Sequence, residues 1–185
     1  MEKKGLLFKG ATIEDLPDII EIDNSYHKYS DIHQGFLIIK YEISQLKNHI
    51  LRKPNSISIA STTDNIIVGF IEISFFLDIK VIKELKWYGE NLRSTFEKGE
   101  KLYIAKVAVK EGYQGRKIGT FMYESIFAKY PGYIFYSFVV KKPFDNIISL
   151  DFHKRMGFIE AAEFKARKFL GLNNYESVML MKFKK

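Results

Sequence analysis

The chain has no cysteine among its 185 residues, which excludes disulfides, thiolate zinc sites and catalysis by a cysteine nucleophile. Long apolar runs are also missing, because no stretch approaches the length needed to cross a bilayer. The first residues lack the apolar core and the cleavage site of a signal peptide. We therefore expect a cytoplasmic protein that has no membrane partner.

Metal ligands are scarce as well. The sequence has four histidines, and their spacing is not that of a metal site. They are His27, His33, His49 and His153. We interpret most of them as scattered surface or half-buried imidazoles and expect no metal cofactor.

Two common nucleotide-binding patterns are absent: the three-glycine dinucleotide pattern, and the P-loop pattern that ends in Gly-Lys-Ser/Thr. A Rossmann cofactor, or a nucleoside triphosphate held in the usual way, is therefore disfavoured. Low-complexity tracts and repeats are absent too. With 46% apolar residues the chain can bury one full core, whereas a second independent domain would be cramped. The sequence predicts a single domain over residues 1–185.

The net charge of +7, from 29 basic and 22 acidic residues, favours anionic ligands in general. The basic residues are dispersed, and their strongest clusters fall in segments that otherwise have strand patterns. These clusters are Lys141-Lys142, residues 165–168 and residues 182–185. Such dispersal argues against nucleic acid as the main partner.

Helical and strand patterns alternate and predict a mixed α/β fold. Strands are expected at residues 6–8, 56–61, 66–76, 101–109, 133–140, 158–169 and 175–183. Helices are expected after Thr12, over residues 41–51, between a glycine-rich turn and Pro131, and over residues 146–156. Residues 77–99 are expected to form an insertion with an irregular helix that shapes a substrate mouth.

Two segments carry predictions about burial. In the helix over residues 41–51, one face presents four apolar side chains that we interpret as core: Ile43, Leu46, Ile50 and Leu51. The strand over residues 101–109 alternates poorly and is mostly apolar, as expected of a central strand covered on both faces.

The most informative segment is residues 107–120, where an apolar run meets an amphipathic run through a turn containing Gly112, Gly115 and Gly119. A helix begins with backbone N–H groups that lack intrahelical partners, and its dipole puts partial positive charge at the same place. Glycines allow close approach of a pyrophosphate, and Arg116 and Lys117 add formal charge. This pattern predicts a phosphate cradle.

The sequence resembles the GNAT superfamily of acyl-CoA-dependent N-acyltransferases. Residues 114–119, Gln-Gly-Arg-Lys-Ile-Gly, match its phosphate motif Gln/Arg-x-x-Gly-x-Gly/Ala, except that Lys117 replaces the first glycine. A second motif of the family matches Asn146, Ser149, Phe152, His153, Gly157 and Phe158. The two motifs occur in the family's order, and the resemblance is strongest over residues 101–158.

The resemblance implies a GNAT fold: a central mixed, mostly antiparallel sheet of six to seven strands, flanked by about four helices and splayed between strands 4 and 5. It implies an N-acetyltransferase that moves an acetyl group from acetyl-CoA directly to a primary amine of a small molecule or a protein or peptide. Neither a metal nor a covalent enzyme intermediate is needed. A homodimer is common in the family, and residues 179–183 of the terminal hairpin could pair across its interface.

The resemblance also implies which residues bind the cofactor. The backbone of the central strand would contact the acetyl-pantetheine arm at Val107, Ala108 and Val109. The backbone amides that would hold the pyrophosphate belong to Gln114, Gly115, Arg116, Lys117, Ile118, Gly119 and Thr120. Asn146 matches a position that contacts the pantetheine arm. For Lys117 two interpretations stay open, a side chain that grips phosphate or a solvated residue whose amide binds.

Three residues are candidates for proton transfer. His153 occupies the position commonly held by a tyrosine that protonates the departing thiolate, and the alternative is a histidine on the helix surface. Glu72 and Tyr103 are candidate general bases, although an alternating strand can turn either side chain away from the cleft. The backbone N–H of Val107 is the candidate oxyanion donor.

Two other function classes stay open. A GNAT-like fold can bind acyl-CoA without turnover, and a basic surface can associate with RNA or the ribosome. The acceptor is not specified by the sequence. The excess positive charge argues against a polyamine unless the mouth is locally acidic, as Glu90, Glu97 and Glu100 would allow.

Overall fold

The computed structural model describes residues 2–3, 5–27, 35–75 and 79–183. The chain divides into two compact units. The first comprises Met1–Lys28, Leu37–Ile73 and Ala105–Tyr130. The second comprises Tyr29–Phe36, Ser74–Ile104 and Pro131–Lys185. Each unit is described separately below, and the single domain stays a prediction.

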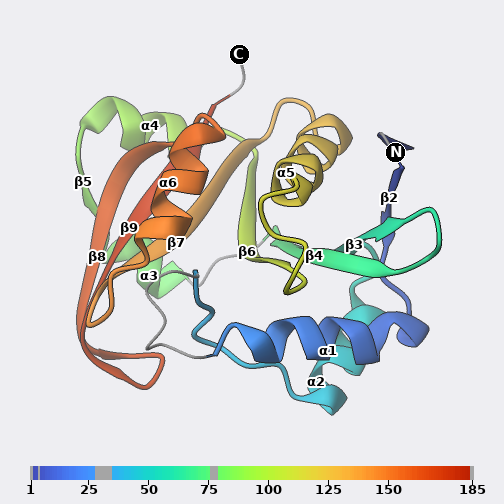
Figure 1. Ribbon diagram of the computed structural model, residues 1–185. Helices are drawn as coiled ribbons and strands as arrows, with labels where there is room; N and C mark the ends of the chain where they lie inside the picture. The colour runs from blue at the N-terminus through green and yellow to red at the C-terminus, as the bar shows by residue number, and fades with distance from the viewer. Residues whose placement is uncertain (1, 4, 28–34, 76–78, 184–185) are drawn as a thin grey trace. The chain divides into compact units, whose positions relative to one another are not determined.

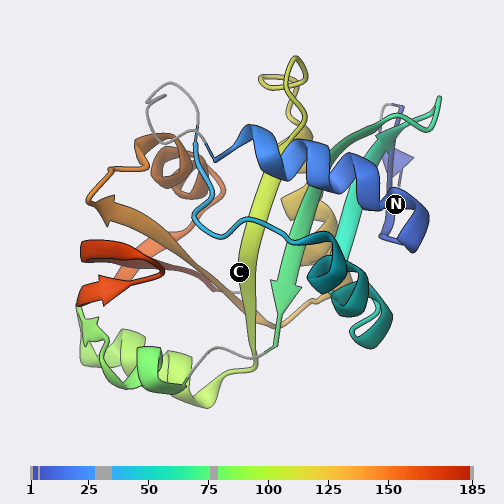
Figure 2. The ribbon, with the colours of Figure 1, turned by 90° about the horizontal axis from the view of Figure 1, so that it is seen from below.

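The first unit is built on antiparallel strands in the order β1-β2-β3-β4, continued by the second half of β6. These strands are β1 (Glu2–Lys3), β2 (Leu6–Gly10), β3 (Ile57–Thr62), β4 (Ile67–Ser74) and β6 (Lys101–Val109). Its helices are η1 (Ile13–Asp15), α1 (Leu16–Ser25), α2 (Ile43–Arg52) and α5 (Ile118–Lys129). Helices α1 and α2 lie on one face of the strands and α5 on the other (Figures 1 and 2).

The start of the first helical segment is set by the predicted capping box. The backbone N–H of Thr12 donates to Asp15 Oδ2 at 2.8 Å, and Pro17 lies in the first turn of α1, where a missing N–H costs nothing. Helix α2 buries Leu46 and Ile50. The predicted four-residue core face is wrong, because Ile43 and Leu51 are 64% and 60% exposed.

Strand β6 alternates strictly, contrary to the expectation of a strand covered equally on both faces. Its buried side chains are Leu102, Ile104, Lys106 and Ala108, and the intervening side chains are partly exposed. A lysine therefore occupies the buried face of an otherwise apolar strand, where an ammonium needs a countercharge.

The second unit has strands in the order β6-β7-β9-β8-β5, where the first half of β6 pairs with β7 in parallel and the other pairs are antiparallel. The new strands are β5 (Lys86–Trp87), β7 (Ile134–Lys142), β8 (Ile159–Phe169) and β9 (Leu172–Lys182). The helices are α3 (Ile79–Lys83), α4 (Glu90–Lys98) and α6 (Ile147–Arg155). Helices α4 and α6 lie on opposite faces of these strands (Figures 1 and 2).

The mixed, mostly antiparallel sheet and the α/β class are confirmed. Nine strands lie in the described part of the chain, rather than six or seven, because β1 and β5 are two-residue strands. The described residues form six α-helices rather than about four, because the predicted insertion holds both α3 and α4. Residues 77 and 78 of that insertion, and residue 76 of the predicted strand, lie outside the described residues. The predicted splay concerns β6 and β7 at the boundary between the units and stays a prediction.

Two further features bear on partners. Pairing of β9 across a dimer interface would require a free strand edge. Strand β9 is hydrogen-bonded to β7 on one side and to β8 on the other, so Met179 does not lie on such an edge. Within residues 5–27, 35–75 and 79–183, no helix is both long and apolar enough to span a bilayer.

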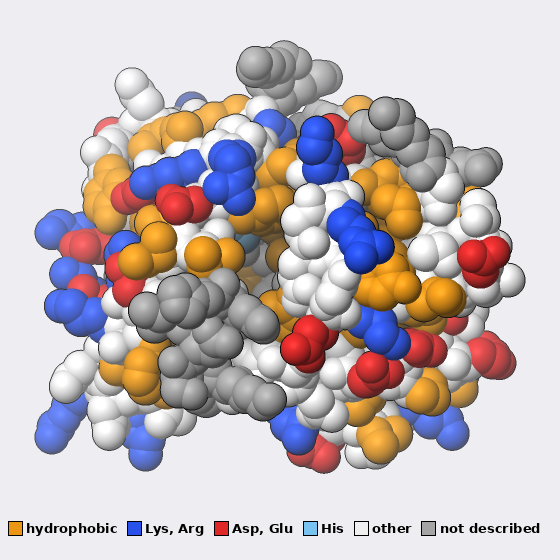
Figure 3. Space-filling view, in the orientation of Figure 1, with side chains coloured by type: hydrophobic (Ala, Val, Ile, Leu, Met, Phe, Trp, Pro, Cys, Tyr) orange, Lys and Arg blue, Asp and Glu red, His pale blue; other side chains and the backbone are white. Residues whose placement is uncertain are grey.

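Charged side chains of both signs are mixed along the edge of the molecule that carries β8 (Figure 3). Lys86 and Lys165 each lie 3.2 Å from a carboxylate oxygen of Glu163, and Lys142 lies 2.8 Å from Glu176. One lysine of each of two predicted basic clusters, Lys142 and Lys165, is thus paired with a carboxylate. Such pairing lowers the local positive potential that a nucleic acid would need.

Candidate functional site

The predicted phosphate cradle is a tight turn between β6 and α5. Gly112 and Gly115 have φ angles of +79° and +76°, which only glycine adopts without strain. The first intrahelical bond runs from the Phe121 N–H to the Lys117 carbonyl at 2.9 Å. The backbone N–H groups of residues 118–120 come before this first intrahelical donor and so lack intrahelical acceptors, as at helix termini that can bind an anion.

Lys117 caps this helix in the left-handed conformation, with φ 62° and ψ 18°. This conformation explains why the GNAT phosphate motif has glycine at the same position, since a side chain there costs about 1 kcal/mol. The Lys117 side chain is exposed.

Tyr26, at the end of α1, ties the cradle to the strand before it. Its hydroxyl donates to the Val109 carbonyl at 2.7 Å and forms a side-chain hydrogen bond with Gln114. Burial raises the pKa of the Tyr26 hydroxyl, which keeps it protonated and able to donate. Sequence reasoning missed this role, because the residue lies 83 positions from Val109.

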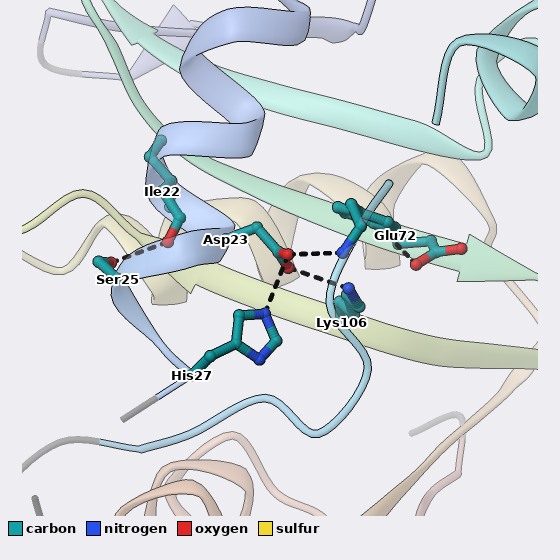
Figure 4. A network of polar contacts seen from close by, with 7 residues as sticks. Ile22, Asp23, Ser25, His27, Glu72 and Lys106 are labelled. Atoms are coloured by element: carbon teal, nitrogen blue, oxygen red, sulfur yellow. Dashed lines mark hydrogen bonds and ion pairs between the residues drawn. The ribbon is translucent and has the colours of Figure 1, made fainter. Parts of the chain in front are cut away.

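A buried polar network lies on the α1 side of β6 (Figure 4). Asp23 is 0% exposed and accepts three hydrogen bonds through its carboxylate. Lys106 Nζ donates to Oδ1 at 2.9 Å, while the Tyr41 backbone N–H and His27 Nε2 approach Oδ2 at 2.9 and 3.0 Å. The carboxylate supplies the countercharge that the buried Lys106 requires, and it fixes the backbone just before α2.

The network continues from Lys106 to β4 through Tyr41. Lys106 Nζ lies 3.4 Å from the centroid of the Tyr41 ring, within cation–π range. The Tyr41 hydroxyl donates to Glu72 Oε2 at 2.5 Å. On the other side of the carboxylate, His49 Nε2 lies 3.7 Å from Oε1, beyond hydrogen-bond distance.

The protonation states follow from burial and from the neighbouring charges. Desolvation lowers the pKa of the Lys106 ammonium, and the hydrogen bond to Asp23 opposes that shift. Desolvation raises the pKa of the Tyr41 hydroxyl well above its usual range, and the Glu72 carboxylate raises it further. Tyr41 is therefore a neutral phenol that donates to Glu72.

Comparison with known proteins decides the family. The family model described as the acetyltransferase (GNAT) family matches residues 16–158, more than half of the chain. The protein belongs to the acetyltransferase (GNAT) family. Among curated proteins, none matches the sequence significantly.

Solved structures share the GNAT fold at low sequence identity. A GNAT-family acetyltransferase from Streptococcus agalactiae has a TM-score of 0.72 and 13% identity, covering 100% of this chain and 98% of its own. Ard1 from Thermoplasma volcanium has a TM-score of 0.67 and 12% identity, with 98% and 99% covered. Arabidopsis thaliana Naa50, in complex with the bisubstrate analogue CoA-Ac-MVNAL, has a TM-score of 0.62 and 15% identity, with 96% and 98% covered.

In this GNAT protein the two candidate bases have different surroundings. Glu72 joins the buried network, and its side chain is 13% exposed. Tyr103 belongs to the second unit, where its ring stacks on Tyr136 with centroids 5.2 Å apart and meets Phe138 edge-on at 6.1 Å. Glu72 thus lies in a polar network and Tyr103 in an aromatic cluster, and the identity of the base stays a prediction.

His153 is neither on the helix surface nor placed as a proton donor. Its ring is 2% exposed and lies edge-on between Phe152 and Phe158. Nδ1 lies 2.7 Å from the Ser149 carbonyl, so Nδ1–H donates there. Burial lowers the pKa of His153 to about 4, so the ring is neutral near pH 7 and is a poor acid. These features argue against the predicted general-acid role.

The buried state of His153 predicts a pH-dependent stability. Its pKa falls from 6.5 unfolded to about 4 folded, so the unfolded chain binds more protons between these values. The free energy of unfolding should decrease by up to roughly 3 kcal/mol as the pH falls from 6.5 to 4. When the free energy of unfolding is measured in urea at several pH values, it should depend less on pH in His153→Phe than in the wild type between pH 6.5 and 4. The same pH dependence in both proteins would contradict a buried, neutral His153.

Asn146 caps α6, which gives the second motif a structural basis. Its Oδ1 accepts from the Ser149 N–H at 3.3 Å, and its Nδ2 donates to the Phe36 carbonyl at 3.0 Å. Gly157, with φ +85°, follows the end of the same helix in the left-handed conformation. Contact of Asn146 with a pantetheine arm stays a prediction.

The described residues contain no cluster of three or more His, Asp or Glu placed to hold a metal ion. His33 lies outside the described residues. His27 and His49 each face a carboxylate in the buried network, Asp23 and Glu72 respectively.

Proposed function

We propose that this protein is an acetyl-CoA-dependent N-acetyltransferase that transfers an acetyl group directly to a primary amine. The observation that carries the proposal is the cradle, where the unpaired amides of residues 118–120 follow a turn shaped by Gly112 and Gly115. Membership of the GNAT family supports the same reaction class. The nucleic-acid alternative is weaker, because Lys142 on β7 and Lys165 on β8 are paired with carboxylates.

The proposed cofactor site follows the chain from β6 into α5. The backbone of Val107 to Val109 would pair with the pantetheine arm, and the amides of residues 114–120 would hold the diphosphate. Arg116 lies beside them, with its guanidinium 4.9 Å from the centroid of the Tyr113 ring. The N–H of Val107 would polarise the thioester carbonyl as charge develops on its oxygen.

The proposed chemistry needs one base and good positioning. The acceptor arrives as an ammonium and gives a proton to Glu72, and the neutral amine then attacks the thioester carbonyl. The tetrahedral intermediate loses the second proton of its nitrogen to water and collapses with cleavage of the carbon–sulfur bond. The CoA thiolate takes a proton from water, since His153 is buried, and the net reaction releases one proton to solvent.

For the acceptor we propose a primary amine of a small molecule or a peptide. The Arabidopsis protein was solved with a peptide bisubstrate analogue, and at 15% identity that likeness carries the fold alone. The test is release of CoA thiol from acetyl-CoA, measured with a panel of small amines and of peptides with free N-termini. Amine-dependent release supports the proposal. Acetyl-CoA binding without release by any acceptor would favour the non-catalytic acyl-CoA-binding alternative.

A further inference from the structure

Tyr41 is held at both its backbone and its side chain. Its backbone N–H donates to Asp23 at 2.9 Å, and its ring lies under Lys106 Nζ and 5.9 Å from the ring of Phe70. The hydroxyl is thereby aimed at Glu72 Oε2. A side chain fixed at so many points has little freedom to turn away from its acceptor.

The contact between Tyr41 and Glu72 has the length of a charge-assisted bond. An O–H···O⁻ hydrogen bond is typically 2.5–2.7 Å long, and this one is 2.5 Å. Because the carboxylate accepts the bond through Oε2, its orientation about the last side-chain torsion is fixed. The other oxygen, Oε1, is then the one directed toward His49.

No residue that the structure describes donates a hydrogen bond to Oε1. His49 Nε2 is 3.7 Å away, and among the residues that the structure describes this buried nitrogen has no hydrogen-bond partner. The other charged or titratable groups of the network are Lys106 from β6, Asp23 from α1 and His27, which follows the end of α1. They meet at Asp23 and not at Oε1.

We propose that Tyr41 is a positioning residue for Glu72: its hydroxyl holds Oε2 and so presents Oε1 to the acceptor ammonium, while Lys106 and Asp23 fix the Tyr41 ring and backbone. This inference rests on the proposed function, since it assigns Glu72 as the base. Tyr41 itself donates no proton to substrate, because its own proton stays in the bond to Glu72.

The test is Tyr41→Phe, which keeps the ring beneath Lys106 and removes only the hydroxyl. We expect kcat/KM for the amine to fall about 10- to 100-fold, the usual effect of losing one hydrogen bond to a charged group. Most of the loss should appear in kcat rather than in KM, because the base is misplaced while the acetyl-CoA site is unchanged. The Kd for acetyl-CoA should stay unchanged.

The matched control is Tyr175→Phe, which also removes the hydroxyl from a buried tyrosine ring, there in β9. It should leave kcat and KM for the amine unchanged. If Tyr41→Phe has the wild-type kcat and KM, the positioning role is overturned and the proposed function is untouched.

A second readout does not need turnover. In a crystal structure of Tyr41→Phe, the Glu72 carboxylate should turn away from the orientation that the Tyr41 hydroxyl holds, and an unmoved carboxylate overturns the inference. If the carboxylate moves but the wild type acetylates no amine, the proposed function fails while the contact between Tyr41 and Glu72 stands.

Discussion

Glu72→Gln should lower kcat/KM for amine acetylation by about 10²- to 10⁴-fold, the usual contribution of a general base. The amide oxygen of glutamine can still accept the Tyr41 hydroxyl, so the network stays intact while the basic oxygen is lost. Most of the loss should appear in kcat, because the cradle that binds acetyl-CoA is unchanged. The measurement is steady-state thiol release over a range of pH.

The pH dependence separates loss of a base from loss of structure. At high pH the acceptor amine loses its proton to solvent, so the defect of Glu72→Gln should shrink. The control is Glu160→Gln, which neutralises a partly exposed glutamate paired with Lys154. A rate defect of the same size at every pH, or no defect at all, would show that Glu72 is not the general base.

Lys106→Met should destabilise the fold by about 3–5 kcal/mol, because it leaves the carboxylate of Asp23 buried without its countercharge. Asp23 is 0% exposed, and its bond to Lys106 Nζ is 2.9 Å long. Urea unfolding measures the change. Lys154→Met, at an exposed ion pair, is the matched control and should leave the urea midpoint unchanged.

The double variant Asp23→Asn with Lys106→Met tests the mechanism of that loss. Because it removes both charges together, it should recover most of the stability, as replacement of buried ion pairs by neutral groups often does. If the loss of unfolding free energy in the double variant equals the sum of the losses in the two single variants, the ion pair is not the source of the destabilisation.

The cradle could be predicted from the sequence because it is local. Gly112, Gly115 and the start of α5 fall within a dozen residues. The positive φ of each glycine is set by the local turn and does not depend on contacts distant in sequence. The conformation of Lys117 could not be predicted, since a lysine at a left-handed position has no signal of its own.

The buried network could not be predicted because its contacts are distant in sequence. Asp23 and Lys106 are 83 positions apart, and Tyr41 and Glu72 are 31 apart. One signal was present: Lys106 falls among apolar residues on the buried side of an alternating strand, so it needed a carboxylate partner. For His153, the pattern placed the residue on a helix but did not indicate which side of the helix faces the core.

The most direct test of the account is calorimetric titration of the folded protein with acetyl-CoA. We expect one exothermic binding event per chain. Gly119→Trp, which places a bulky side chain over the cradle amides, should raise the Kd at least about 10-fold. Lys117→Gly should retain binding, since the backbone amide stays in place. No heat of association with wild-type protein that is shown to be folded by circular dichroism would contradict the claim that this turn binds coenzyme A.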